Sequence, residues 1–114
     1  MTPQECGDLL ARIVLIDGRT VTPGVILAWH EVLADLDLDD CLDALTAVRR
    51  DNPDRIMPAH IRREVADMVE ARRMRAKRWV PSPAALDDVD TYLAEYRAWH
   101  AAAGRRPSTR EVTA

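Results

Sequence analysis

Apolar residues recur at every third or fourth position in four successive segments of this sequence, and three of these segments follow a helix-start signal. Thr2-Pro3-Gln4-Glu5 is a capping box, because Thr2 caps a helix while the Glu5 carboxylate reaches back to the Thr2 amide. A second Thr-Pro pair begins at Thr22, a break falls at Asp37, and Pro58 starts the fourth segment. No comparable alternation indicates a strand, so the pattern predicts an all-α protein.

The predicted core consists of the apolar residues on these stripes. They are Cys6, Leu9, Leu10, Ile13 and Ile16; Val25, Ile26, Trp29, Val32, Leu33 and Leu36; Leu38, Cys41, Leu42, Leu45 and Val48; and Ile61, Val65, Met68 and Val69. The sequence contains no Phe, so aliphatic side chains must fill most of this core. A chain of 114 residues is long enough for one modest core of this kind.

Beyond the fourth segment, Val80-Pro81-Ser82-Pro83 predicts a stiff connector, since proline disfavours helix in the residue before it. A fifth helix is expected from about 84 to 103, with Gly104 stopping it. We therefore expect a small helical bundle over residues 1–70. An extended basic helix and a C-terminal amphipathic helix should occupy 71–104, and a disordered tail 105–114.

Charge is distributed unevenly along the chain. Residues 31–54 carry eight acidic side chains against two arginines, whereas residues 55–78 carry eight basic side chains against three acidic ones. The fourth helix is expected to continue through this basic run as far as Trp79. Its apolar face becomes narrower after Val69. This polarity favours a module that binds another macromolecule over an enzyme.

The basic run has three interpretations. It is a solvated helix face, a surface that binds the phosphate backbone of DNA, or a surface that docks on an acidic protein. The candidate partner-binding residues in this run are Arg62, Arg63, Arg72, Arg73, Arg75, Lys77, Arg78 and Trp79.

Three aromatic residues follow at helical spacing in the expected fifth helix: Tyr92, Tyr96 and Trp99. Aromatics at this spacing either belong to a core or form a docking surface of the helix-in-groove kind. We include all three among the candidate partner-binding residues, because the connector could hold this helix apart from the bundle.

Residues with catalytic or metal-binding chemistry are scattered. His30, His60 and His100 lie far apart, and none has a Cys or carboxylate at the spacing of a metal site. The acidic cluster at residues 35–43 lacks the glycine and terminal Glu of a calcium loop, so a solvated helix start explains it. We expect no catalytic residues, no metal and no cofactor.

The sequence also predicts a cytoplasmic protein without a membrane partner. Its N-terminus lacks the basic start and apolar run of a signal peptide, and no stretch reaches the length of a spanning helix. Cys6 and Cys41 both fall on predicted apolar stripes, which is typical of free, buried thiols.

The first 65 or so residues resemble the phage replicative-helicase loader and inhibitor proteins, including similar small proteins of actinobacterial phages and prophages. The segments that carry the resemblance are VILAWHEVLADL, DLDDCLDALTAVRR and the helix start MPAHIRREV. The matching positions are Trp29, Leu33, Leu42, Ala44, Val48, Pro58 and Ile61. The resemblance implies a helical N-terminal domain and a C-terminal part that engages the ring-shaped replicative helicase of the host.

On this basis we expect a non-enzymatic replication adaptor that binds a replicative helicase or another replisome protein. The alternative is a small DNA-binding regulator that uses the basic helix 62–78. Loading and inhibition of the helicase both remain open, as does a homo-oligomeric state.

Overall fold

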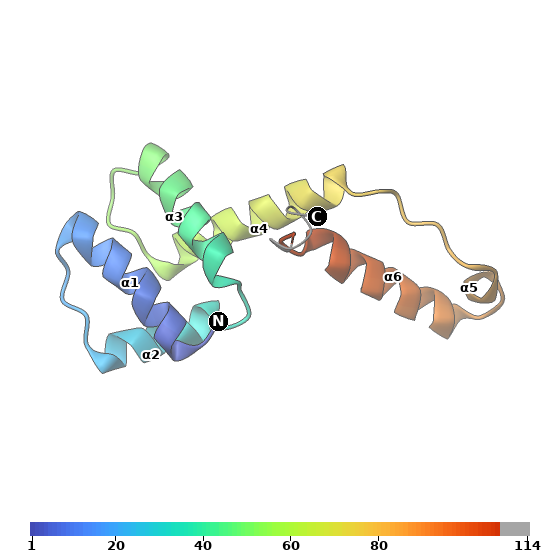
Figure 1. The fold of residues 1–114 in the computed structure, drawn as a ribbon, viewed down its shortest axis with the longest axis horizontal. Coiled ribbons are helices and arrows are strands. Elements are labelled where there is room, and N and C mark those ends of the chain that lie inside the picture. Colours follow the sequence, from blue (N-terminus) through green and yellow to red (C-terminus); the bar gives the residue numbers. More distant parts are fainter. Residues whose placement is uncertain (108–114) are drawn as a thin grey trace. The chain divides into compact units, whose positions relative to one another are not determined.

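The computed structural model describes residues 1–107, and over that range its regular structure is entirely α-helical (Figure 1). The helices are α1 (Pro3–Asp17), α2 (Pro23–Leu33), α3 (Leu38–Asp51), α4 (Pro58–Arg75), α5 (Pro83–Asp87) and α6 (Val89–Gly104). The predicted all-α fold is therefore confirmed.

The chain divides into two compact units, Met1–Met68 and Val69–Ala114, which we call the N-terminal and C-terminal units. The division falls inside α4, so this helix contributes its first part to one unit and its last part to the other. The predicted bundle ends two residues later, at 70. Most of the predicted disordered tail, from residue 108 on, lies outside the described residues.

Local capping explains where the helices of the N-terminal unit begin and end. The Thr2 hydroxyl accepts the Glu5 amide and the Glu5 carboxylate accepts the Thr2 amide, which confirms the capping box. Thr22 and Asp37 cap α2 and α3 in the same manner, each accepting the amide of the third residue after it. Gly18 ends α1 with φ 66°, a left-handed conformation that glycine adopts without a steric cost.

The core of the N-terminal unit lies where α1 packs against α2 and α3. Its buried apolar residues are Cys6, Leu9, Leu10, Ile13, Trp29, Leu33, Cys41, Ala44, Leu45, Val48, Ile56, Ile61 and Val65. Two residues expected in the core, Ile16 and Val32, are exposed instead. Each lies in the last turn of its helix, where the apolar stripe runs past the packed part of the unit.

Candidate partner-binding surface of the C-terminal unit

The basic helix is shorter than the sequence predicts. α4 ends at Arg75, so Lys77, Arg78 and Trp79 lie in the non-helical connector that leads to α5. The prediction of a helix as far as Trp79 is wrong. The last turn of α4 is tighter than an α-helical turn, because the Ala76 amide donates to the carbonyl of Arg73. The backbone then leaves the helix.

Side-chain contacts of the connector account for this early end. The indole ring of Trp79 packs edge-on against Tyr92, with ring centroids 4.8 Å apart, and against Tyr96 at 5.3 Å. The Trp99 indole nitrogen donates to the carbonyl of Lys77 at 3.1 Å. These contacts with α6 stabilise the non-helical path of the connector.

The aromatic residues predicted as a docking surface lie close together, and they mainly contact one another and Trp79. Tyr96 also lies against Trp99, with ring centroids 6.1 Å apart. Such edge and offset pairs contribute about 0.5–1.5 kcal/mol each beyond the area they bury. The set Trp79, Tyr92, Tyr96 and Trp99, which we call the aromatic cluster, holds the connector on α6, although both tyrosines remain partly exposed.

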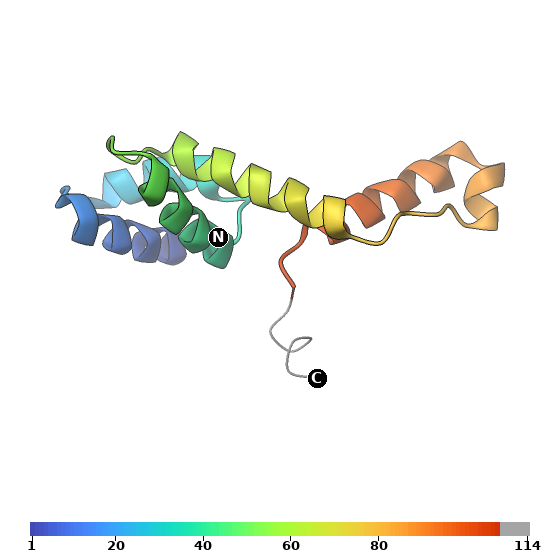
Figure 2. The ribbon, with the colours of Figure 1, turned by 90° about the horizontal axis from the view of Figure 1, so that it is seen from above.

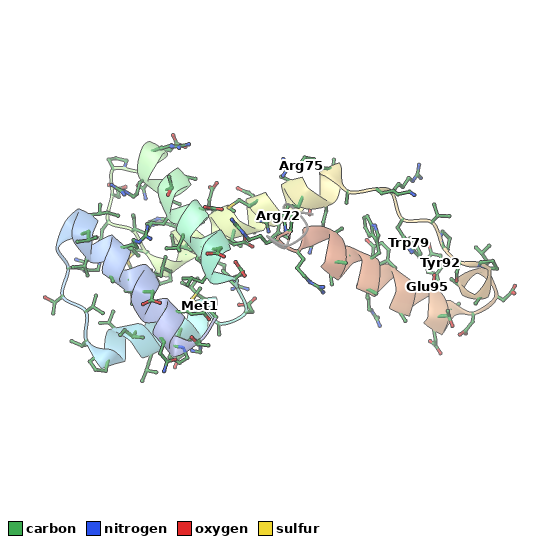
Figure 3. The ribbon with its side chains drawn as sticks, in the orientation of Figure 1. Met1, Arg72, Arg75, Trp79, Tyr92 and Glu95 are labelled. Carbon is green, nitrogen blue, oxygen red and sulfur yellow. The ribbon has the colours of Figure 1, made fainter. Side chains whose placement is uncertain are left out.

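Glu95 completes the attachment of the connector, and sequence reasoning missed it. Its carboxylate accepts the Ser82 amide at 3.1 Å and also the Ser82 hydroxyl. Figure 3 shows Glu95 with Trp79 and Tyr92 on the side of α6 that faces the connector. The one available signal was its spacing, because Glu95 lies three residues after Tyr92 and four before Trp99 and so falls on the same helix face as both.

The single fifth helix predicted for residues 84–103 is also wrong, because Asp88 interrupts it. Asp88 is extended, with φ −144° and ψ 119°, and separates α5 from α6. Figure 2 shows these as two separate helices. The Asp88 carboxylate accepts the amide and the hydroxyl of Thr91, and these bonds hold the pKa of Asp88 below its ordinary value. An aspartate that caps the following helix stabilises this break.

Two candidate arginines anchor the C-terminal end of α6 to α4. The Arg73 side chain donates to the carbonyl of His100 at 3.0 Å, and Arg72 donates to the carbonyl of Gly104 at 3.3 Å. The carbonyl of Gly104 belongs to the last turn of α6, whose carbonyls lack partners inside the helix, so the Arg72 donor stabilises it. Arg73 adds a bond to a carbonyl one turn earlier. Gly104 is the last residue of α6 rather than the stop that follows it, which corrects its predicted role.

Gly104 is buried because α4 lies directly against it. A Cβ atom at this position would come within 2.8 Å of a Val69 methyl carbon and 3.0 Å of the Arg73 guanidinium. Only glycine therefore allows this close approach of α6 to α4 without a shift of a neighbouring side chain or of the backbone.

We expect Gly104→Ala to destabilise the C-terminal unit by about 1 kcal/mol, because overpacking costs about 1–3 kcal/mol and helix propensity returns up to about 1 kcal/mol. Amide hydrogen exchange along α6 measures the effect and should become faster. The double variant with Val69→Ala removes the steric conflict and should recover the original protection. Equal protection in Gly104→Ala and the unchanged protein would contradict this packing.

The two remaining candidates on α4 lie in the N-terminal unit. Arg62 donates to both carboxylate oxygens of Asp35, at 2.7 and 2.8 Å, and to the carbonyl of Val32. These bonds hold the pKa of Asp35 below its ordinary value. Both side chains are exposed, so the ion pair contributes little to stability. Arg63 is exposed and lines a shallow cavity of about 350 Å³ together with His60.

Three candidate basic residues stay exposed in the C-terminal unit: Arg75, Lys77 and Arg78. Two apolar side chains flank them, Met74 at 79% exposed and Val80 at 76% exposed. We call these five residues the α4-end surface. By contrast, Arg72, Arg73 and the aromatic cluster, which were predicted for partner binding, make contacts within the unit itself.

The two units differ in charge. The N-terminal unit contains seven basic and thirteen acidic side chains, a net charge of −6, and the C-terminal unit contains nine and six, a net charge of +3. Within residues 1–107, no three side chains of His, Cys, Asp or Glu are grouped so as to hold a metal ion. No helix in this described part is long and apolar enough to cross a membrane.

The fold and this surface define a small all-α protein with an acidic N-terminal unit and a basic C-terminal unit. The chain matches no protein-family model, no curated protein and no solved structure. A functional proposal therefore rests on its own residues and on the resemblance of its first 65 residues described above.

Proposed function

We propose that this chain is a non-enzymatic adaptor that binds a replicative DNA helicase through the α4-end surface. The observation that carries the proposal is the joint exposure of apolar and basic side chains over residues 74–80. Exposed apolar side chains beside charged ones are typical of protein-binding sites. The choice of a helicase comes from the resemblance in sequence.

Charge supports an acidic partner surface. Arg75, Lys77 and Arg78 make no ion pair or side-chain hydrogen bond within residues 1–107, so their charges remain available to a partner. Basic side chains at the rim of an interface speed association with an acidic surface, and salt weakens this effect. Binding of the partner would also bury the apolar surface of Met74 and Val80, and this burial favours association.

The test is size-exclusion chromatography with light scattering, run on the protein alone, with a ring-shaped replicative helicase of an actinobacterial host, and with a short DNA duplex. We expect co-elution with the helicase. Reversing Arg75, Lys77 and Arg78 to Glu should raise the Kd at least about tenfold, since three steering charges change sign. Failure of the unchanged protein to bind the helicase would overturn the proposal.

A matched control makes the same change in net charge on the N-terminal unit. Arg12, Arg49 and Arg50 are exposed there, and their reversal to Glu should leave helicase binding within about twofold of the unchanged protein if the α4-end surface is the site. An equal loss in both variants would show that binding depends on net charge alone.

The DNA arm of this experiment tests the alternative, a DNA-binding regulator. If the three exposed basic residues contact phosphates, the slope of log K against log salt should be about −3, at about −0.9 for each contact. Co-elution with duplex and not with helicase would favour this alternative. Undetectable duplex binding at about 50 mM salt would exclude it.

A further inference from the structure

α6 carries an exposed apolar stripe beside the aromatic cluster. Its residues are Val89, Leu93 and Tyr96, which are 72%, 39% and 42% exposed. Their spacing of four and then three residues is the spacing of core positions in a two-stranded coiled coil, and His100 continues it. The Tyr96 ring lies against the rings of Trp79, Trp99 and His100, but the residue is still 42% exposed.

Two exposed charges of opposite sign flank this stripe. Asp90 directly follows Val89, and Arg97 directly follows Tyr96, so both lie on the same flank and seven residues apart. When two such helices pair in an antiparallel manner, the same flank of each helix faces that of the other, and the two sequences run in opposite directions. Asp90 of one copy then lies beside Arg97 of the other, and the same pair forms again across the two-fold axis.

The apolar residues agree with this register. When Leu93 of one helix packs opposite Tyr96 of the other, Val89 lies opposite His100, and the two-fold axis repeats both contacts. The stripe and its flanking charges are therefore complementary to a second copy of themselves. A parallel arrangement would bring neither Asp90 and Arg97 together nor large residues opposite small ones.

We propose that a second copy of this chain covers the exposed stripe, forming a two-fold symmetric dimer through antiparallel α6 helices. This inference concerns the protein alone and is independent of the proposed helicase adaptor, which uses the α4-end surface. Because α6 has 16 residues and offers about two heptads, we expect a weak dimer, with a Kd on the order of 10 μM.

Sedimentation equilibrium of the full chain over a range of about 1–300 μM tests the dimer, since this range spans the expected Kd. The average mass should rise from 12.8 kDa toward twice that value. Leu93→Asp should raise the Kd at least about tenfold, because it places two carboxylates at the centre of the contact. Leu15→Asp, at an exposed position of α1, is the matched control and should leave the Kd unchanged.

Charge reversal tests the register. Asp90→Arg or Arg97→Asp alone sets like charges opposite each other and should raise the Kd by about five- to tenfold, whereas the double reversal should restore it to within about twofold. Far-UV circular dichroism confirms that each variant keeps its helices. A monomer at every concentration, or a dimer that Leu93→Asp does not weaken, would overturn the proposal. A double reversal that stays weak would overturn the antiparallel register.

Discussion

Replacing Trp29 by alanine is expected to lower the free energy of unfolding of the N-terminal unit by about 3–5 kcal/mol. Trp29 is only 6% exposed and is the largest side chain in the core. The Arg19 guanidinium lies over its ring, 5.5 Å from the centroid, and also bonds to Asp17 and to the carbonyl of Ile56. Truncation of Trp29 therefore leaves a cavity and removes the aromatic ring that lies against the nearly buried Arg19 guanidinium.

Urea unfolding followed by circular dichroism measures this effect, and amide hydrogen exchange in α1 to α3 assigns it to the N-terminal unit. Leu27→Ala is the matched control, because Leu27 belongs to the same helix and is exposed. It should change stability by no more than about 0.5 kcal/mol. A loss of less than about 1 kcal/mol for Trp29→Ala would contradict the packing of α2 described here.

The N-terminal unit was largely predictable because local signals and burial agree there. Thr2 and Thr22 cap the helices that the sequence assigned to them, and the predicted break at Asp37 lies where α3 begins. The apolar spacing identified Trp29 as a core residue. Both cysteines are free and buried, as their positions on the stripes predicted. Where the chain departs from prediction, at Ile16 for example, a stripe continues beyond its packing partners.

The C-terminal unit was less predictable because contacts distant in sequence decide its structure. Lys77 has good helix propensity, yet its carbonyl is bonded by Trp99, twenty-two residues away. Asp88 sits within a helical pattern but caps a new helix instead. Tertiary contacts of this kind override local propensity, and local sequence patterns do not show which residues will make them.

Contacts between residues distant in sequence also divide the predicted binding residues into those that bond within the protein and those that stay exposed. Arg72 and Arg73 find carbonyl acceptors at the end of α6, and Arg62 finds a carboxylate at Asp35. None of these acceptors is near its donor in sequence. A run of arginines predicts a charged surface, but only the fold determines which arginines remain available to a partner.

Raising the pH above about 9 is expected to destabilise the N-terminal unit through Cys41, since unfolded thiols ionise with a pKa of about 8.5. Burial, together with the nearby Asp40 and Asp37 carboxylates, raises the pKa of Cys41 to about 12. The folded state therefore keeps the proton while the unfolded state releases it. Stability from this group is complete below the unfolded pKa and is lost as the pH rises toward the folded pKa.

The expected loss is about 1.4 kcal/mol per pH unit, or about 2 kcal/mol between about pH 9 and 10.5. Urea unfolding at a series of pH values measures it. Cys41→Ala is the control, because its packing cost is the same at every pH while its thiol titration is absent. Tyrosine and lysine ionise in both proteins, so the difference between the two curves isolates Cys41. If the free energies of unfolding of the unchanged protein and of Cys41→Ala change in parallel with pH, the raised pKa of Cys41 is contradicted. Solvent would then reach the thiol in the folded state.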